Sequence, residues 1–135
     1  MDRDTEIPQT GSSRSGWSLI GFANAAVNYE VWQPSQDGGG GGNVRALPLS
    51  PTPLTTGRLH HLVVTYDGSR IVGYFDGVNG NTRSASGAVQ GGGDLYWGCQ
   101  ADMTSCLDDW LIDELAIYDS VLQPDRVKAH FDLGK

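Results

Sequence analysis

The chain has 135 residues, a length that fits one domain with a buried core. Hydrophobic residues make up 39% and Gly contributes 19 residues, a composition too apolar for disorder and rich in turn formers. The formal net charge of −7 leaves no basic surface for a phosphate backbone, so we expect no nucleic-acid partner. No stretch reaches the roughly 18 apolar residues of a membrane span, and no signal peptide is visible.

The N-terminal part begins with a polar, Ser- and Gly-rich stretch that predicts a flexible lead-in over residues 1–16, ahead of one domain over residues 17–133. Residues 17–22 and 29–33 combine aromatic and β-branched side chains and predict two strands joined by a turn. Residues 43–49 form a weaker strand candidate.

The strongest local pattern is HHLVVTYDGSRIVGYFDG at residues 60–77. Two β-rich runs flank Asp67-Gly68-Ser69, and Asp and Gly suit the positive φ angles of a tight hairpin. Alternation places His61, Val63 and Thr65 on one face and Leu62, Val64 and Tyr66 on the other. Asp76-Gly77 marks the next turn.

The C-terminal part predicts a short strand at residues 95–98 and a long one at residues 110–118. Residues 123–131 have helical features: Pro124 stands where a first-turn proline belongs, Val127 and Phe131 are four apart, and Gly134 follows. Many short strands and one terminal helix predict an all-β fold, a two-sheet antiparallel sandwich with a short C-terminal helix.

Four of these segments resemble the laminin-G-like jelly-roll domains of the concanavalin A-like lectin/glucanase superfamily. They are His60 to Gly68, Phe75 to Gly77, Leu95 to Gly98, and Ile112 to Leu122, in the family's order and spacing. Leu59 stands where the family usually has Trp, and the aromatic-rich stretch that begins the family domain is missing upstream. The resemblance implies a jelly roll that either lacks the family's N-terminal strands or closes its sheets in another way. Missing strands would expose sheet edges and favour self-association.

Cys99 and Cys106 are the only two cysteines. Because proteins that resemble this family are often extracellular, the resemblance favours oxidised cysteines. We expect them to form a disulfide across the polar loop between them. The alternative is two free thiols in a reducing cytosol, because no signal peptide is visible. A zinc site is less favoured, since two thiols supply only half of the usual four ligands.

Resemblance also directs attention to Asp113, because the equivalent acidic residue of concanavalin A-type sandwiches often helps to bind a structural Ca²⁺. Asp108 and Asp109 are nearby carboxylates with no motif behind them. The alternative is that Asp113 only forms a hydrogen bond with a neighbouring loop.

Aromatic side chains could stack on sugar rings. Alternation favours a core position for Trp97 and Trp110, while Tyr96 points away from Trp97 and is the exposed candidate for ligand binding. The remaining tryptophans are Trp17 and Trp32.

The sequence lacks the motifs of two enzyme classes, retaining glycosidases and hydrolases with a serine nucleophile. No alternating E-x-D-x-E carboxylate pattern of a retaining glycosidase is present, because Glu6, Glu30 and Glu114 are dispersed. No G-x-S-x-G occurs for His60, His61 or His130 to serve as a hydrolase base. We therefore expect a non-catalytic recognition module, lectin-like and carbohydrate-binding, that is extracellular or at the cell surface by its family resemblance. The alternatives are a structural or cell-adhesion module within a larger protein, and a degenerate glycosidase.

Overall fold

The computed structural model describes residues 16–21, 27–33, 43–48, 54–55, 57–85 and 111–134. In the first three of these ranges it describes the backbone and, of the side chains, only that of Pro48. The strands are β1 (Gly16–Gly21), β2 (Val27–Gln33), β3 (Asn43–Pro48), β4 (Leu62–Tyr66), β5 (Arg70–Phe75) and β6 (Val78–Ser84), and the helix is α1 (Pro124–Leu133).

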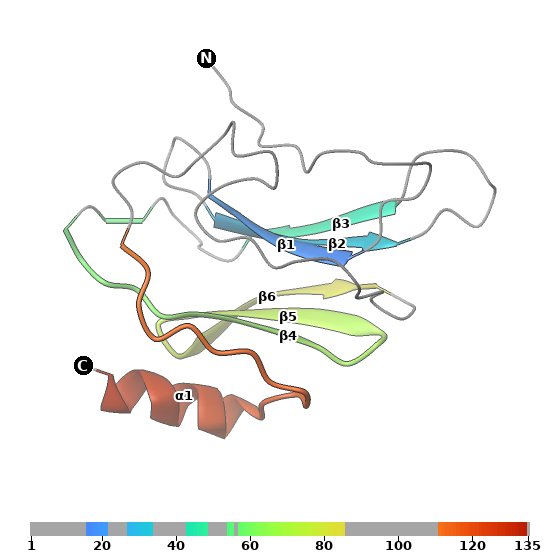
Figure 1. Cartoon of the computed structure of the whole chain (residues 1–135). Coiled ribbons are helices and arrows are strands. Elements are labelled where there is room, and N and C mark those ends of the chain that lie inside the picture. Colours follow the sequence, from blue (N-terminus) through green and yellow to red (C-terminus); the bar gives the residue numbers. More distant parts are fainter. Residues whose placement is uncertain are drawn as a thin grey trace, which may run out of the picture.

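The strands form two antiparallel sheets, in the orders β1-β2-β3 and β4-β5-β6. The sheets lie one above the other, and α1 lies on the far side of the β4-β5-β6 sheet (Figure 1). β3 lies near β5 and β6, and the Asn81 side-chain amide donates a 2.7 Å hydrogen bond to the Pro48 carbonyl oxygen. The antiparallel strands and the C-terminal helix confirm those parts of the expected fold. The jelly-roll winding involves residues outside the described part and stays a prediction.

The β4–β5 hairpin forms where the sequence predicts it. Gly68 has φ +90°, which a residue without a Cβ adopts at little cost. The Asp67 carboxylate accepts hydrogen bonds from the Ser69 amide, the Ser69 hydroxyl and the Arg70 amide at 2.7–2.9 Å. These bonds, led by that from the Ser69 amide, lower the pKa of Asp67 and hold the turn in one shape.

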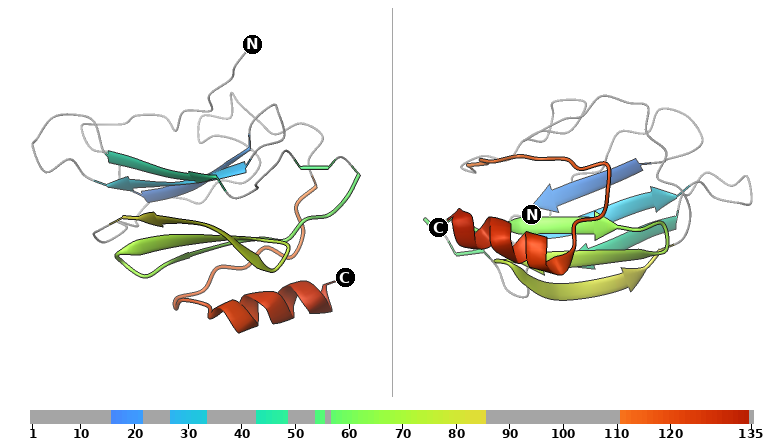
Figure 2. Two further views of the ribbon diagram at one scale, coloured as in Figure 1. Left: turned by 180° about the vertical axis from the view of Figure 1, so that it is seen from behind. Right: turned by 90° about the horizontal axis from the view of Figure 1, so that it is seen from below.

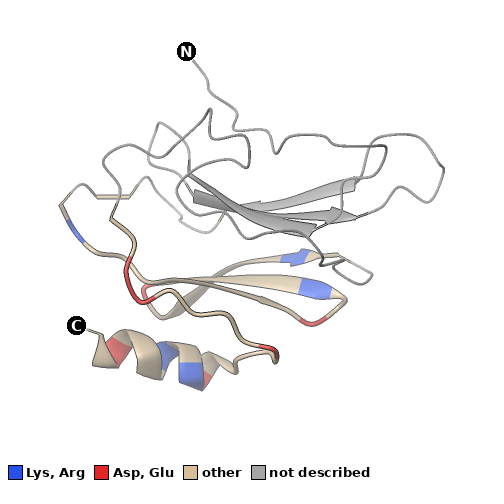
Figure 3. Cartoon of the chain, viewed as in Figure 1, with Lys and Arg blue, Asp and Glu red and all other residues tan. Residues whose placement is uncertain are grey.

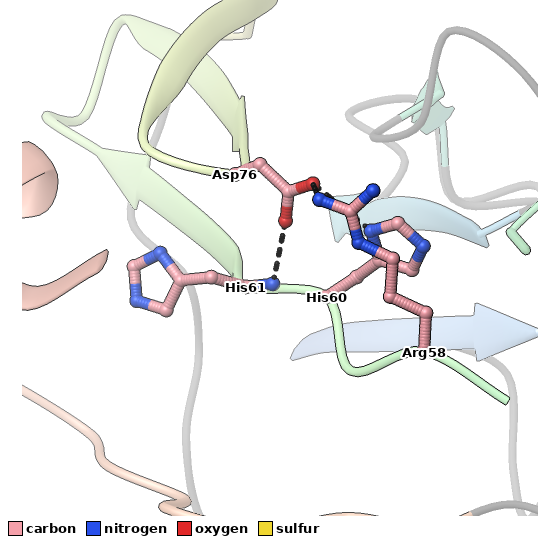
Figure 4. Close-up of polar contacts among 4 residues, drawn as sticks. All are labelled: Arg58, His60, His61 and Asp76. Carbon is pink, nitrogen blue, oxygen red and sulfur yellow. Dashed lines mark hydrogen bonds and ion pairs between the residues drawn. The ribbon is translucent and has the colours of Figure 1, made fainter. Parts of the chain in front are cut away.

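One face of the β4–β5 hairpin is directed toward helix α1 and the other toward the β1-β2-β3 sheet. His61 points toward α1 and His60 toward the other sheet, as Figure 4 shows, so strand alternation assigns the residues that follow. Tyr66 lies opposite Ile71, which is fully buried, on the face toward the first sheet. Val63 lies opposite Tyr74 on the face toward the helix. Both faces of the β4–β5 hairpin are therefore largely shielded from solvent.

Helix α1 packs on that outer face through one side. Pro124 begins the helix, where a missing backbone N–H costs nothing, and the Arg126 and Val127 amides donate to the Gln123 carbonyl oxygen. Val127 is fully buried and Phe131 lies one turn later, against the β5–β6 turn. The views from behind and below show the helix lying across the β4-β5-β6 sheet (Figure 2). The predicted helix is confirmed, extended to Leu133.

Strand β6 was not expected from the sequence. Its residues VNGNTRS carry one apolar side chain, and most of them are exposed. The two-residue turn Asp76-Gly77, with φ +50° and +78°, returns the chain alongside β5 regardless of that composition. Backbone pairing, with an irregularity between Val72 and Tyr74, supplies the strand.

The long strand predicted at residues 110–118 is wrong for residues 111–118, which contain no strand in the structure. Glu114 has φ +53°, a left-handed conformation that interrupts an extended chain. A strand also needs a partner, and no backbone hydrogen bond joins these residues to another described element. The strand predicted at residues 95–98 lies outside the described part. Among the residues placed by the structure, no helix is long and apolar enough to cross a membrane.

Candidate functional site

The densest polar cluster of the described residues surrounds Asp76, at the end of β5 (Figure 4). The His61 amide donates to Asp76 Oδ1 at 3.0 Å, and His60 Nδ1 lies 3.0 Å from Oδ2. The Arg58 guanidinium lies 3.9 Å from the same Oδ2. One carboxylate thus joins the chain entering β4 to the turn leaving β5.

These contacts set the charge of Asp76. Burial raises the pKa of the carboxyl, but the hydrogen bonds from the His61 amide and His60, with the charges of His60 and Arg58, outweigh it. The pKa of Asp76 therefore lies below its ordinary value of 3.8, and the group is a carboxylate at neutral pH. Because an ionised acceptor forms stronger hydrogen bonds, this carboxylate is a firm anchor for the hairpin.

His60 completes an Asp–His pair that has no access to a substrate. Its side chain is 8% exposed and its ring stacks on Phe75 with centroids 4.9 Å apart. Its other ring nitrogen, Nε2, is buried and has no hydrogen-bond partner among the described residues. A catalytic histidine needs that second nitrogen at the reacting atom. The geometry of His60 is therefore that of a structural clamp.

His61 faces the helix. Its ring lies 6.0 Å from that of Phe131, and Nδ1 is buried without a hydrogen-bond partner. Burial lowers the pKa of His61, the positive charge of His130 lowers it further, and Asp76 partly opposes both effects. Neutral imidazole is thus the form that fits beneath α1.

Asp113 lies on the exposed segment that leads to α1. Its Oδ1 accepts a 2.9 Å hydrogen bond from the amide of the next residue, Glu114. Ca²⁺ takes six to eight oxygen ligands, roughly, and no group of three His, Cys, Asp or Glu side chains suited to a metal occurs in the described part. The calcium site at Asp113 stays a prediction.

The other predicted site residues lie outside the described residues. They are Tyr96, Cys99 and Cys106, together with Trp97, Asp108, Asp109 and Trp110. Sugar stacking at Tyr96 and the disulfide between Cys99 and Cys106 stay predictions. Trp17 lies on β1 and Trp32 on β2.

The Asp76 cluster was not expected from the sequence, although the sequence carries a signal for it. The turn at Asp67-Gly68-Ser69-Arg70 fixes the hairpin register, in which Leu62 lies opposite Phe75. Continuing the register by one step places His61 opposite Asp76. A carboxylate at the end of one strand and two histidines at the start of its partner are thus predictable neighbours.

Comparison of the sequence with known families gives one match, which covers residues 3–128 and is described as the concanavalin A-like lectin/glucanases superfamily. The chain belongs to this family. The match confirms the resemblance carried by the hairpin and C-terminal motifs. Concanavalin A-like proteins are β-sandwiches, in agreement with the antiparallel sheets described above.

A solved structure that resembles this concanavalin A-like chain is the 2.1 Å crystal structure of an S-layer domain-containing protein from Clostridium thermocellum. The two are 16% identical with a TM-score of 0.44, over 96% of this chain and 69% of that one. A search of curated proteins found no match. The family assignment therefore rests on the sequence match, and concanavalin A-like membership indicates a binding module.

Proposed function

We propose that this chain is a non-catalytic recognition module whose ligand is a glycan. The observation that carries the proposal is membership of a family of lectins and glucanases over residues 3–128. Retaining glycosidases of this fold use alternating carboxylates in an E-x-D-x-E pattern, and the sequence contains no E-x-D-x-E motif. Of the two activities in the family's description, we therefore assign sugar binding to this chain.

The described architecture limits where a sugar could bind. Helix α1 lies over part of the outer face of the β4-β5-β6 sheet, and the other sheet lies on its inner side. Both carboxylate oxygens of Asp76 already accept hydrogen bonds from the chain that enters β4. We place the glycan site away from these surfaces, with Tyr96 as the first candidate for stacking on a sugar ring.

A glycan array of neutral and cationic oligosaccharides tests the proposal, followed by titration of any sugar that binds. We expect weak binding, with dissociation constants of roughly 0.1–1 mM, because sugar hydroxyls exchange water for protein hydrogen bonds at little net gain. We expect no hydrolysis of the bound sugar on prolonged incubation.

Two variants locate the site. Tyr96→Ala should abolish binding without lowering the melting temperature, whereas Tyr118→Ala, which removes an exposed tyrosine elsewhere, should leave binding unchanged. If Tyr96→Ala unfolds the protein, Trp97 becomes the stacking candidate. If no glycan binds at millimolar concentration, the proposal is wrong.

A second candidate is an adhesion or spacing module that binds protein within a larger extracellular molecule. One observation favours it. The segment before α1 exposes six large hydrophobic side chains to solvent, as a protein-binding surface does.

A further inference from the structure

An ionisable ring, the imidazole of His61, lies in the layer between the start of β4 and helix α1. Figure 4 shows this ring pointing away from His60 and from the carboxylate of Asp76. Its centroid is 6.0 Å from that of the Phe131 ring of α1. Its Nδ1 is buried and forms no hydrogen bond within the described part of the chain. The ring therefore lies against an apolar neighbour, where a positive charge is poorly solvated.

Helix α1 depends on the same contact for its attachment. Phe131 packs so closely on the β5–β6 turn that a Cβ at Gly77 would lie 2.8 Å from its Cδ1. Phe131 thus joins that turn and the ring of His61 to the helix. The helix has 10 residues, fewer than the roughly 12–15 that even good helix formers need to be stable alone in water. Loss of this contact should therefore unwind α1 as well as release it from the sheet.

Three effects set the protonation of His61. Burial is the largest and lowers the pKa of the ring, and the positive charge of His130 on α1 lowers it further. The Asp76 carboxylate acts in the opposite direction, but its hydrogen bond is with the backbone amide of His61, at 3.0 Å. From the segment before α1, the ring of Tyr118 lies 6.1 Å from that of His130. The docked helix therefore favours the neutral form of His61.

The other ionisable residues of these elements are exposed or lie farther from the ring. Helix α1 carries charged residues of both signs, as Figure 3 shows, and the carboxylates of residues 111–120 are exposed. Arg58 is 66% exposed and lies 3.9 Å from Oδ2 of Asp76, and Tyr74 of β5 is buried on the face toward the helix. The exposed charged residues of α1 are Asp125, Arg126, Lys128 and Asp132.

We propose that protonation of His61 at mildly acidic pH releases helix α1 from the β4-β5-β6 sheet while the β4–β5 hairpin stays folded. A proton on the ring adds a positive charge beside His130 that water solvates only after the helix has moved away. The hairpin is retained because the carboxylates of Asp67 and Asp76, which hold its two ends, have pKa values below 3.8 and stay ionised. Release uncovers Tyr74, which is 4% exposed while the helix is docked. The proposal is independent of glycan binding, because it uses none of the residues assigned to the sugar.

Linkage gives the direction and the limit of the effect. The ring of His61 has an ordinary pKa of 6.5 once released and a lower pKa while the helix is docked. The released state therefore binds the proton more readily, and docking weakens as the pH falls from 6.5 through the docked pKa. Because one proton is involved, the equilibrium constant for release should rise by at most about tenfold per pH unit.

Hydrogen exchange of the full chain tests the proposal, at closely spaced pH values from about 7.5 to 4.5, a range that stays above the pKa of Asp76. Protection factors correct each amide for the intrinsic effect of pH on exchange. The amides of α1 should be less protected than those of β4 and β5 throughout. Their protection should fall by up to about tenfold per pH unit below 6.5 and should be lost while β4 and β5 are still protected.

Three variants identify the group responsible. His61→Gln removes the titrating ring and should make the protection of α1 nearly independent of pH in this range. His130→Gln removes the neighbouring charge that lowers the pKa of His61, so the total fall in protection should be smaller. Arg126→Gln, a matched loss of one positive charge from an exposed position on α1, should leave the pH dependence unchanged. If His61→Gln does not fold by circular dichroism, His130→Gln carries the test.

Three results would overturn the proposal. The first is equal protection of α1, β4 and β5 at every pH, which means that the helix opens only when the whole domain unfolds. The second is constant protection of α1 across the pH range. The third is an unchanged pH dependence in a folded His61→Gln or, if that variant does not fold, in His130→Gln, which assigns the effect to another group.

Discussion

Two glycines of the β4-β5-β6 sheet share a backbone conformation and differ in their surroundings. Gly68 in the β4–β5 turn has φ +90°, and a Cβ built there would meet no atom within 4 Å. Gly77 in the β5–β6 turn has φ +78°, and its Cβ would lie 2.8 Å from Cδ1 of Phe131. Gly77 is therefore favoured for two reasons, its positive φ and the close approach of helix α1. Gly68 is favoured only for its positive φ.

Substitution of each glycine by Ala should separate the free-energy cost of the positive φ from the cost of the contact with α1. Gly68→Ala should cost about 1–2 kcal/mol of unfolding free energy, from the positive φ alone. Gly77→Ala should cost about 1–3 kcal/mol more, because Phe131 must also move. Urea unfolding monitored by tryptophan fluorescence measures both. Equal losses would mean that α1 shifts freely on the turn.

At the scale of the element, α1 is attached to the sheet by one side. Val127 is fully buried, while Leu133 on the same helix is 85% exposed. Val127→Ala should cost about 2 kcal/mol, because two buried methyl groups are lost and a cavity remains. Leu133→Ala, its matched control, should change stability by less than about 0.5 kcal/mol. Hydrogen exchange of the α1 amides should accelerate only in the first variant, and acceleration in both would contradict one-sided packing.

The layer between β4 and α1 should also respond to pH. The pKa of His61 lies below 6.5 because of burial and the charge of His130, so the unfolded chain binds a proton more readily than the folded one. The contribution of neutral His61 is complete above pH 6.5 and is lost as pH falls through the lower folded pKa. Stability should therefore begin to fall as the pH drops below about 6.5.

The control for this pH dependence is Asp76, whose pKa is lowered from 3.8 and whose contribution is lost only at more acidic pH. His61→Gln should flatten the stability profile just below pH 6.5. Asp76→Asn should flatten it below about pH 4 and, because Asp76 raises the pKa of His61, should also lower the pKa of His61 further. Thermal melts at closely spaced pH values measure both profiles. An unchanged profile in His61→Gln would assign the effect to another group.

At the scale of the whole molecule, the net charge of −7 governs which partners can approach. Polyanions such as heparin should be repelled, most strongly at low ionic strength where screening is weakest. We expect no retention on a heparin column in low-salt buffer containing a chelator. Retention that weakens as salt is added would reveal a basic patch that the composition conceals.

Much of the described fold was predictable because it depends on local chemistry. Asp67 and Gly68 specify a tight turn, alternation specifies the faces of β4, and Pro124 with Val127 and Phe131 specifies a one-sided helix. The family followed from motifs in the same segments. Within the candidate site, the turn at Asp76 was expected, but its contacts with His60 and His61 were not.

What the sequence by itself determined is therefore the class of fold, the turns and the family, since each depends on residues close together in the chain. The tertiary structure decided three matters. It paired the polar residues of β6 with β5, since backbone hydrogen bonds do not require apolar side chains. It brought the Asp76 carboxylate within hydrogen-bonding distance of His61 and His60, which lie 15 and 16 residues away in the sequence. It gives residues 111–118 no strand despite their strand composition, and among the described residues no other strand pairs with them.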